Sequence, residues 1–291
     1  MIKYAIENLL AMDGVELSSS SQDPPYVRGK VFNSRPSYPF RFDGIGVAPG
    51  DVPEWLCADL GSEERPNFTA IFNHNMTTLL NSTDLFYFQA CILGCPPTSG
   101  FCDWDLYDLS GGAEFNLDLS GRIRSDHKNV CSGEFDMGSD YRYYRWSVID
   151  SLNTENFIEW GEVFLGEIKE FVYGKLQPGR SDGPEFHEGT NITSYGQIWP
   201  NYLSESDSFQ IEIVNHNDIN QISELRTFVK EVKRNDGKFV FIPDDQVNLC
   251  YYVYMRNLQD FNQQIVRGME KELYSWKMDL ITLTEGIRLI G

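Results

Sequence analysis

The sequence predicts a mainly β protein in two parts: an N-terminal jelly-roll β-sandwich and a C-terminal β-sandwich or barrel with one packed α-helix. Three observations predict this. Apolar and polar residues alternate repeatedly before residue 173, as half-buried strands do. A segment rich in Pro and Gly, GKLQPGRSDGPEFHEG, then breaks the pattern. After it, one stretch of helical spacing lies among further alternating segments. The expected domain ranges are 1–173, a linker at 174–189, and 190–291.

Strands are predicted along the first part wherever apolar residues recur at every second position, with Gly, Pro, Asn and Asp between the runs. Gly161 interrupts the last alternation as a β-bulge would. No long helix is expected here. The predicted strands are WLCADLG (55–61), FTAIFNHN (68–75), AEFNLDL (113–119), RYYRWSVID (142–150) and FIEWGEVFLGE (157–167).

The second part begins with a strand, SFQIEIV, in which Phe209, Ile211 and Ile213 share a face. A helix is predicted over 219–233, because apolar residues recur there with helical spacing, and Asn235-Asp236-Gly237 ends it. The apolar stripe consists of Ile222, Leu225, Phe228, Val229 and Val232. Further strands are predicted in KFVFIPDD (238–245), CYYVYMR (250–256) and LYSWKMDLITLTE (273–285), where Tyr274, Trp276, Met278 and Leu280 share a face.

Charge and hydropathy exclude several classes of function. The net charge of −19 over 291 residues argues against nucleic-acid binding, because phosphate contacts need clustered Lys and Arg. No apolar run approaches the roughly 20 residues of a membrane helix, so membrane insertion is not expected. The start, MIKYAIENLLAMDG, does not have the pattern of a secretion signal, which predicts a cytoplasmic place of synthesis. The charge is −14 over residues 1–173 and −5 over 174–291, which also suggests two domains.

Two histidines stand in the same frame, in IFNHN (71–75) and IVNHN (213–217). Each follows a predicted strand, but the surrounding patterns differ, so an internal repeat is not expected. Asn217 or Asp218 can cap the following helix without a metal. His74 and His216 are therefore predicted to be turn residues that tolerate replacement by Asn.

The motifs of common enzyme classes are absent, and no catalytic residue is predicted. Asp103, Asp105 and Asp108 suit a structural calcium ion, the one cofactor considered, or form a solvated acidic turn. Tyr38, Trp104 and Tyr107 offer faces on which a sugar can stack, or pack at an edge or in the core.

The order of features in residues 4–75 and 142–167 resembles discoidin-like, galactose-binding-type jelly rolls of bacteriophage tail proteins. The resembling stretches are YAIENLLAMDGVELSSSSQDPPY, VFNSRPSYPFRF, WLCADLG, FTAIFNHN and RYYRWSVIDSLNTENFIEWGEVFLGE. Phe40 stands where these proteins often carry Trp. The part from about residue 195, with its helix, GKFVFIPDD, YYVYMR and YSWKMDLITLTE, looks like the β-sandwich of minor or distal tail proteins.

The resemblance implies a structural virion protein of the tail tip or baseplate, assembled in the cytoplasm of the bacterial host. It also implies a ring of identical subunits, a hexamer, that contacts other tail proteins such as tube, hub or fibre. The rival hypothesis is a carbohydrate-binding protein that recognises a host surface glycan. A weaker third hypothesis is an accessory of a glycan-processing enzyme, or a hydrolase.

The predicted helix has a basic face opposite its apolar stripe, formed by Arg226, Lys230, Lys233 and Arg234. Since a helix on the outside of a subunit buries only one face, the basic face is expected to meet solvent or a partner. In an acidic chain it is predicted to attract the acidic surface of a neighbouring subunit or tail protein.

Overall fold

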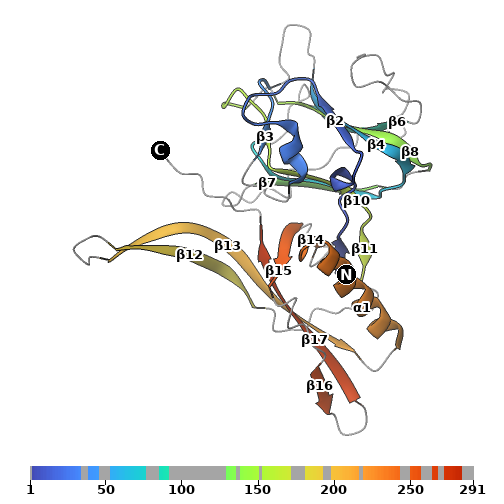
Figure 1. The fold of residues 1–291 in the computed structure, drawn as a ribbon, viewed down its shortest axis with the longest axis vertical. Helices are drawn as coiled ribbons and strands as arrows, with labels where there is room; N and C mark the ends of the chain where they lie inside the picture. Colours follow the sequence, from blue (N-terminus) through green and yellow to red (C-terminus); the bar gives the residue numbers. More distant parts are fainter. Residues whose placement is uncertain are drawn as a thin grey trace. The chain divides into compact units, whose positions relative to one another are not determined.

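The computed structural model confirms a mainly β chain with antiparallel sheets and one α-helix (Figure 1). It divides into two compact units. Unit 1 consists of Met1–Ile6 and Lys169–Gly291, and unit 2 of Glu7–Ile168. The structure describes residues 2–33, 39–45, 53–76, 85–91, 129–135, 138–150, 153–171, 181–192, 198–215, 219–242, 250–256, 264–267 and 272–283.

Unit 2 is a β-sandwich of the jelly-roll kind. One sheet has the order β2-β4-β8-β6, another has the order β10-β5-β7, and β3 pairs with β9. Two 3₁₀ turns, η1 and η2, precede β3. The elements are η1 Leu9–Ala11, β2 Glu16–Ser19, η2 Arg28–Phe32, β3 Phe40–Arg41, β4 Glu54–Glu64, β5 Phe68–His74, β6 Leu85–Cys91, β7 Asn129–Glu134, β8 Tyr141–Ile149, β9 Glu159–Trp160 and β10 Glu162–Gly166.

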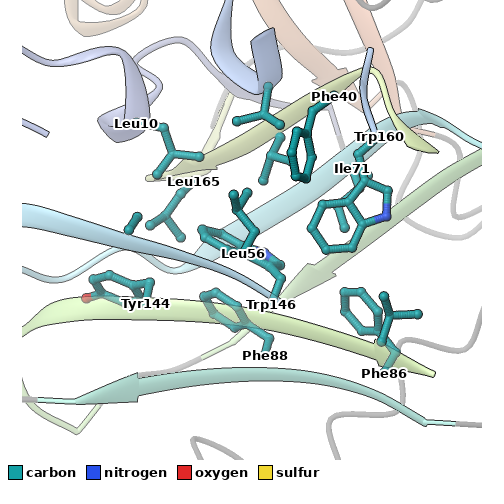
Figure 2. Close-up of a cluster of buried hydrophobic side chains, with 14 of the residues drawn as sticks. Leu10, Phe40, Leu56, Ile71, Phe86, Phe88, Tyr144, Trp146, Trp160 and Leu165 are labelled. Atoms are coloured by element: carbon teal, nitrogen blue, oxygen red, sulfur yellow. The ribbon is translucent and has the colours of Figure 1, made fainter. Parts of the chain in front are cut away.

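The core of unit 2 forms where the alternating apolar side chains of its sheets meet (Figure 2). Trp146 of β8 is fully buried, and its indole N–H donates to Thr69 Oγ1 on β5 at 3.0 Å. The Thr69 hydroxyl in turn donates to the Phe164 carbonyl at 2.9 Å, so this buried polar pair is satisfied. Phe40 is also fully buried and pairs with Trp160, which makes it a core residue.

Four of the predicted strands of the first part are present, as β4, β5, β8 and β9–β10. The predicted interruption at Gly161 separates β9 from β10, and the Gly161 N–H donates to the Phe72 carbonyl at 3.0 Å. The strand predicted at 113–119 lies outside the described residues.

Unit 1 is built on one sheet with the order β11-β1-β14-β15-β17-β13-β12, and β16 pairs with β17. Its helix α1 matches the predicted one within a residue. The elements are β1 Lys3–Ala5, β11 Lys169–Glu170, β12 Ser181–Ile192, β13 Ile198–Asn215, α1 Ile219–Arg234, β14 Lys238–Ile242, β15 Tyr251–Met255, β16 Gln264–Arg267 and β17 Glu272–Thr282.

Helix α1 packs its apolar stripe on this sheet. Leu225, Phe228 and Val232 are buried in a core with Tyr4, and Val229 is half-buried. The Phe228 ring meets three other rings edge-on, those of Tyr4, Phe171 and Phe239, at centroid distances of 4.9, 4.9 and 5.3 Å. The apolar residues lie along one side of the helix, and this side therefore faces the sheet.

The helix ends as its sequence predicts. Gly237 has φ +82° and its N–H donates to the Val232 carbonyl at 2.9 Å, a left-handed helix end that suits glycine. Asn235 adds a long-range contact, because its side-chain amide donates to the Ile6 carbonyl at 2.8 Å.

The units and the predicted domain ranges differ at two places. Residues 1–6 belong to unit 1, because β1 pairs with β14 on one side and β11 on the other. Residues 181–189 of the predicted linker form most of strand β12, which pairs with β13 along its length. Pairing with β13 gives residues 181–189 a strand conformation that their own composition, rich in Gly and Pro, does not predict.

Unit 2 is thus an insertion between two adjacent strands of unit 1. The chain leaves unit 1 after Ile6 and returns at Lys169, and Lys3 pairs directly with Glu170. Asn8 fixes the first residues of unit 2 to strand β10. Its side chain donates to the Val163 carbonyl at 2.9 Å and accepts from the Leu165 N–H at 3.1 Å. Ends that lie this close are typical of an inserted domain.

Candidate functional site

The basic face predicted on α1 is exposed in the structure. Arg226, Lys230, Lys233 and Arg234 are all exposed, whereas Leu225, Phe228 and Val232 are buried. No ion pair joins any of the four to another residue in the described part of the chain. Glu231, on the same helix, pairs instead with Lys169 at 3.7 Å. The face is therefore a compact, accessible patch of positive charge.

A second feature of unit 1 is the hairpin of β12 and β13, which extends well past β17 as a long twisted ribbon (Figure 1). Residues 208–215 of β13 pair with β17, whereas residues 198–207 pair only with β12 among the described residues. We name the segments 184–192 and 198–207 the hairpin arm. Its two outer edges offer backbone N–H and C=O groups that no described strand pairs.

In unit 2 the structure brings together a cluster that the sequence did not predict, around Arg41. The Arg41 guanidinium lies between the rings of Tyr26 and Phe157, at 3.8 and 3.9 Å from their centroids. It pairs with Glu159 at 2.8 Å and with Asp23 at 3.6 Å. Burial disfavours the charge, but the hydrogen bond and charge of Glu159 outweigh it, so the pKa of Arg41 is raised and the group stays cationic.

One sequence signal could have located this cluster. In FRF (Phe40 to Phe42) both Phe side chains enter the core, so the alternation of a strand turns Arg41 to the opposite face. The aromatic and acidic partners come from residues 23–26 and 157–159, and no local pattern links these segments. The cluster joins a fixed cation, two carboxylates and two half-buried rings, the kinds of group that orient a polar ligand.

The other predicted ligand-binding residues lie outside the described residues. This holds for Tyr38, Trp104 and Tyr107, and for the calcium candidates Asp103, Asp105 and Asp108. Their roles stay predictions. Within the described ranges no three His, Cys, Asp or Glu side chains are grouped as a metal site would require.

The IFNHN stretch has a structural task. Asn73 has φ +56° at a register shift between β5 and β7. Asn75 fixes the following turn: its amide donates to the Phe157 carbonyl and its oxygen accepts from the Glu159 N–H, at 3.0 and 2.7 Å. Asn73 tolerates the left-handed backbone conformation, and the side chain of Asn75 stabilises the turn. Two asparagines at the end of this strand are thereby explained.

The prediction that His74 is a turn residue is wrong, because its side chain is only 4% exposed at the end of β5. Its Nδ1 accepts from the Met76 N–H at 3.2 Å, and its Nε2 has no partner among the described residues. Burial lowers the pKa of His74 to about 3, so the imidazole is neutral at physiological pH. His216 lies outside the described residues.

His74 should make stability depend on pH. Below about 6.5 the unfolded chain binds a proton on this residue that the folded chain does not. The stability that the neutral His74 contributes is therefore complete above pH 6.5. It is lost as the pH falls towards 3, by up to about 1.4 kcal/mol per pH unit.

Asn at this position keeps an acceptor for the Met76 N–H but does not titrate. We expect the unfolding free energies of the wild type and His74→Asn to converge as pH falls from 7 to 4, measured by urea denaturation. A difference that is constant with pH would contradict a buried neutral imidazole.

Three cysteines of the described region are buried. They are Cys57, Cys91 and Cys250. Burial raises the pKa of Cys57 to about 12, so its nucleophilic thiolate form is not populated near neutral pH.

Among the described residues, no helix has both the length and the apolar character that crossing a membrane requires.

Comparisons with known proteins give only distant likenesses. No family model matches the chain, and no curated protein matches it. Its fold is similar to a family 32 carbohydrate-binding module of NanJ from Clostridium perfringens, in complex with galactose (14% identity, 57% of this chain, 99% of that chain, TM-score 0.37). It is also similar to the lectin domain of lectinolysin complexed with Lewis B antigen (13% identity, 56% and 98%, TM-score 0.35).

A third similar structure is chitosan-binding module 1 of a chitosanase/glucanase from Paenibacillus sp. IK-5, with 12% identity, 55% and 98% coverage and a TM-score of 0.35. The similar structures are thus carbohydrate-binding domains.

Proposed function

We propose that this chain is a structural, non-enzymatic protein that assembles with copies of itself through unit 1 and carries unit 2 as an inserted jelly-roll module. The observation that carries the proposal is the hairpin arm. Over residues 198–207 it is a two-stranded ribbon, which is at best marginally stable alone in water. Its open edges are suited to pairing with another chain. A partner that covers the arm would therefore stabilise it.

We propose that self-association through the arm is head-to-tail, with the arm of one subunit against a different part of the next subunit. Such heterologous contacts close into a ring when the rotation between subunits allows it. A ring is also what the resemblance to distal and minor tail proteins implies. The setting we propose is accordingly the tail tip or baseplate of a bacteriophage, with tube, hub or fibre proteins as further partners.

The test is a chain in which the arm is trimmed without disturbing the sheet. Gly183 pairs with Ser208, so residues 184–207 can be replaced by Asn-Gly, which forms a two-residue turn between paired strands. We expect the full chain to sediment as an oligomer and the trimmed chain as a monomer with the same melting temperature. An oligomer that survives trimming would overturn the proposed role of the arm.

The second candidate function is carbohydrate binding by unit 2. The Arg41 cluster favours it, because hydroxyl-rich ligands need charged hydrogen-bonding groups beside aromatic faces. The similar structures are described in complex with galactose and with Lewis B antigen. Glycan-array binding by the full chain, lost on Arg41→Lys with the fold retained, is the expected result, since Lys cannot reproduce a planar stacked guanidinium.

A further inference from the structure

The basic face of α1 carries charges that repel one another. Arg226 and Lys230 are four residues apart, as are Lys230 and Arg234, so like charges lie one above the other on the helix surface. Such pairs of like charge destabilise a helix unless a carboxylate from another part of the protein, or from a partner, pairs with them. Helix α1 holds two acidic residues, Glu224 and Glu231, and Glu231 is already paired with Lys169.

The hairpin arm has the opposite charge. Within its segments 184–192 and 198–207 the sequence holds four carboxylic acids and no Lys or Arg. These acids are Glu185, Glu188, Glu205 and Asp207. The chain thus carries, in the same unit, an acidic ribbon whose strand edges are open and a basic helix face that is exposed.

One chain cannot readily join these two surfaces to each other. Helix α1 packs over β1 and β14 through Phe228, whereas β12 lies at the far edge of the same sheet. Four strand spacings separate β14 from β12, about 19 Å at 4.8 Å per strand. Residues 198–207 extend past the part of β13 that pairs with β17 (Figure 1). Ten strand residues span about 34 Å, which is long enough to reach a neighbouring molecule.

We propose that the acidic hairpin arm of one copy lies along the basic face of α1 of the next copy, which is the contact that repeats in the assembly. This rests on the proposed function and adds to it the identity of the two surfaces. The contact joins different patches on the two molecules, as a closing ring requires. Because it is electrostatic, it also accounts for a basic face on a chain with a net charge of −19.

The experiment exchanges the charges of the two surfaces. The helix-reversed chain carries Arg226→Glu, Lys230→Glu and Lys233→Glu, and the arm-reversed chain carries Glu185→Lys, Glu188→Lys and Glu205→Lys. A matched control carries Asp13→Lys, Glu63→Lys and Asp140→Lys, three exposed acids of unit 2. Self-association of each full chain is measured by sedimentation at low and high salt, and folding by thermal unfolding.

Each of the two reversed chains should associate at least about tenfold more weakly than the wild type, since each places like charges opposite one another. The effect should shrink at high salt, where exposed charges are screened. The chain that carries both reversals should recover association to within about threefold, because complementarity is restored with opposite signs. The unit 2 control should associate as the wild type does.

Four results would overturn the contact. The helix-reversed chain associates normally, or the arm-reversed chain does. Both are weakened but their combination is not restored, so that the two surfaces do not face each other. A further chain that carries the helix reversal together with Asp13→Lys, Glu63→Lys and Asp140→Lys recovers association, whereas the chain with both reversals does not, so that the basic face meets unit 2. If instead the wild type is a monomer at every concentration, the proposed assembly itself fails together with the contact.

Discussion

A chain that begins at Glu7 is expected to lose the cooperative unfolding of unit 1 while unit 2 keeps its own. The missing strand β1 lies between β11 and β14, and Ile2, Tyr4 and Ile6 are buried in the core of unit 1. Burial of each such side chain stabilises by about 1.5–3 kcal/mol. The total loss is comparable to the whole stability of a domain, about 5–15 kcal/mol.

The measurement is calorimetry, in which the full chain should show two transitions and the shortened chain one. A matched control keeps residues 1–6 and replaces 7–168 by a short Gly/Ser linker. Because Lys3 pairs with Glu170, the two ends that the linker joins are already adjacent. The control should retain the transition of unit 1. Two transitions in the chain that begins at Glu7 would show that unit 1 folds without β1.

Phe228→Ala is expected to lower the free energy of unfolding of unit 1 by about 3–5 kcal/mol. The side chain is fully buried and meets the rings of Tyr4, Phe171 and Phe239, so its removal leaves a cavity between the helix and two strands of the sheet. Rings that meet edge-on add to the energy of simple burial.

Thr227→Ala serves as the control, because Thr227 neighbours Phe228 on the helix but is exposed. It should change stability by no more than about 0.5 kcal/mol. Both variants are measured by denaturant titration, and the transition of unit 2 should not move in either. Equal stability of the two variants would mean that α1 does not pack through its apolar stripe.

Regular elements could be predicted from the sequence because burial imposes a period. The alternation in residues 55–60 and 142–149 is that of strands with one face in a core, and it places Leu56 and Trp146 inward, as observed. The helical spacing of Leu225 and Val232 likewise identified α1 and its inward face. The registers of Ile211 with Met278 and of Phe209 with Leu280 match the faces predicted for both strands.

What could not be predicted depends on contacts between distant residues. Nothing near β1 signals that Tyr4 pairs with Phe241, more than two hundred residues away, so the sequence alone places the first strand in the first domain. Strand β12 has Gly, Pro and acidic residues in place of an apolar alternation, and its partner β13 supplies the strand conformation. The Arg41 cluster and the burial of His74 have the same origin, since both are made by segments that meet only in the fold.

Mass photometry and negative-stain microscopy of the full chain test the central claim most directly, because both detect closed assemblies without a partner protein. The account predicts a discrete oligomer that appears as rings, with a mass that is a whole multiple of 33.4 kDa, and that dissociates when residues 184–207 are trimmed. A chain that remains a monomer over the full range of concentration at low salt, with the hairpin arm intact, would contradict it.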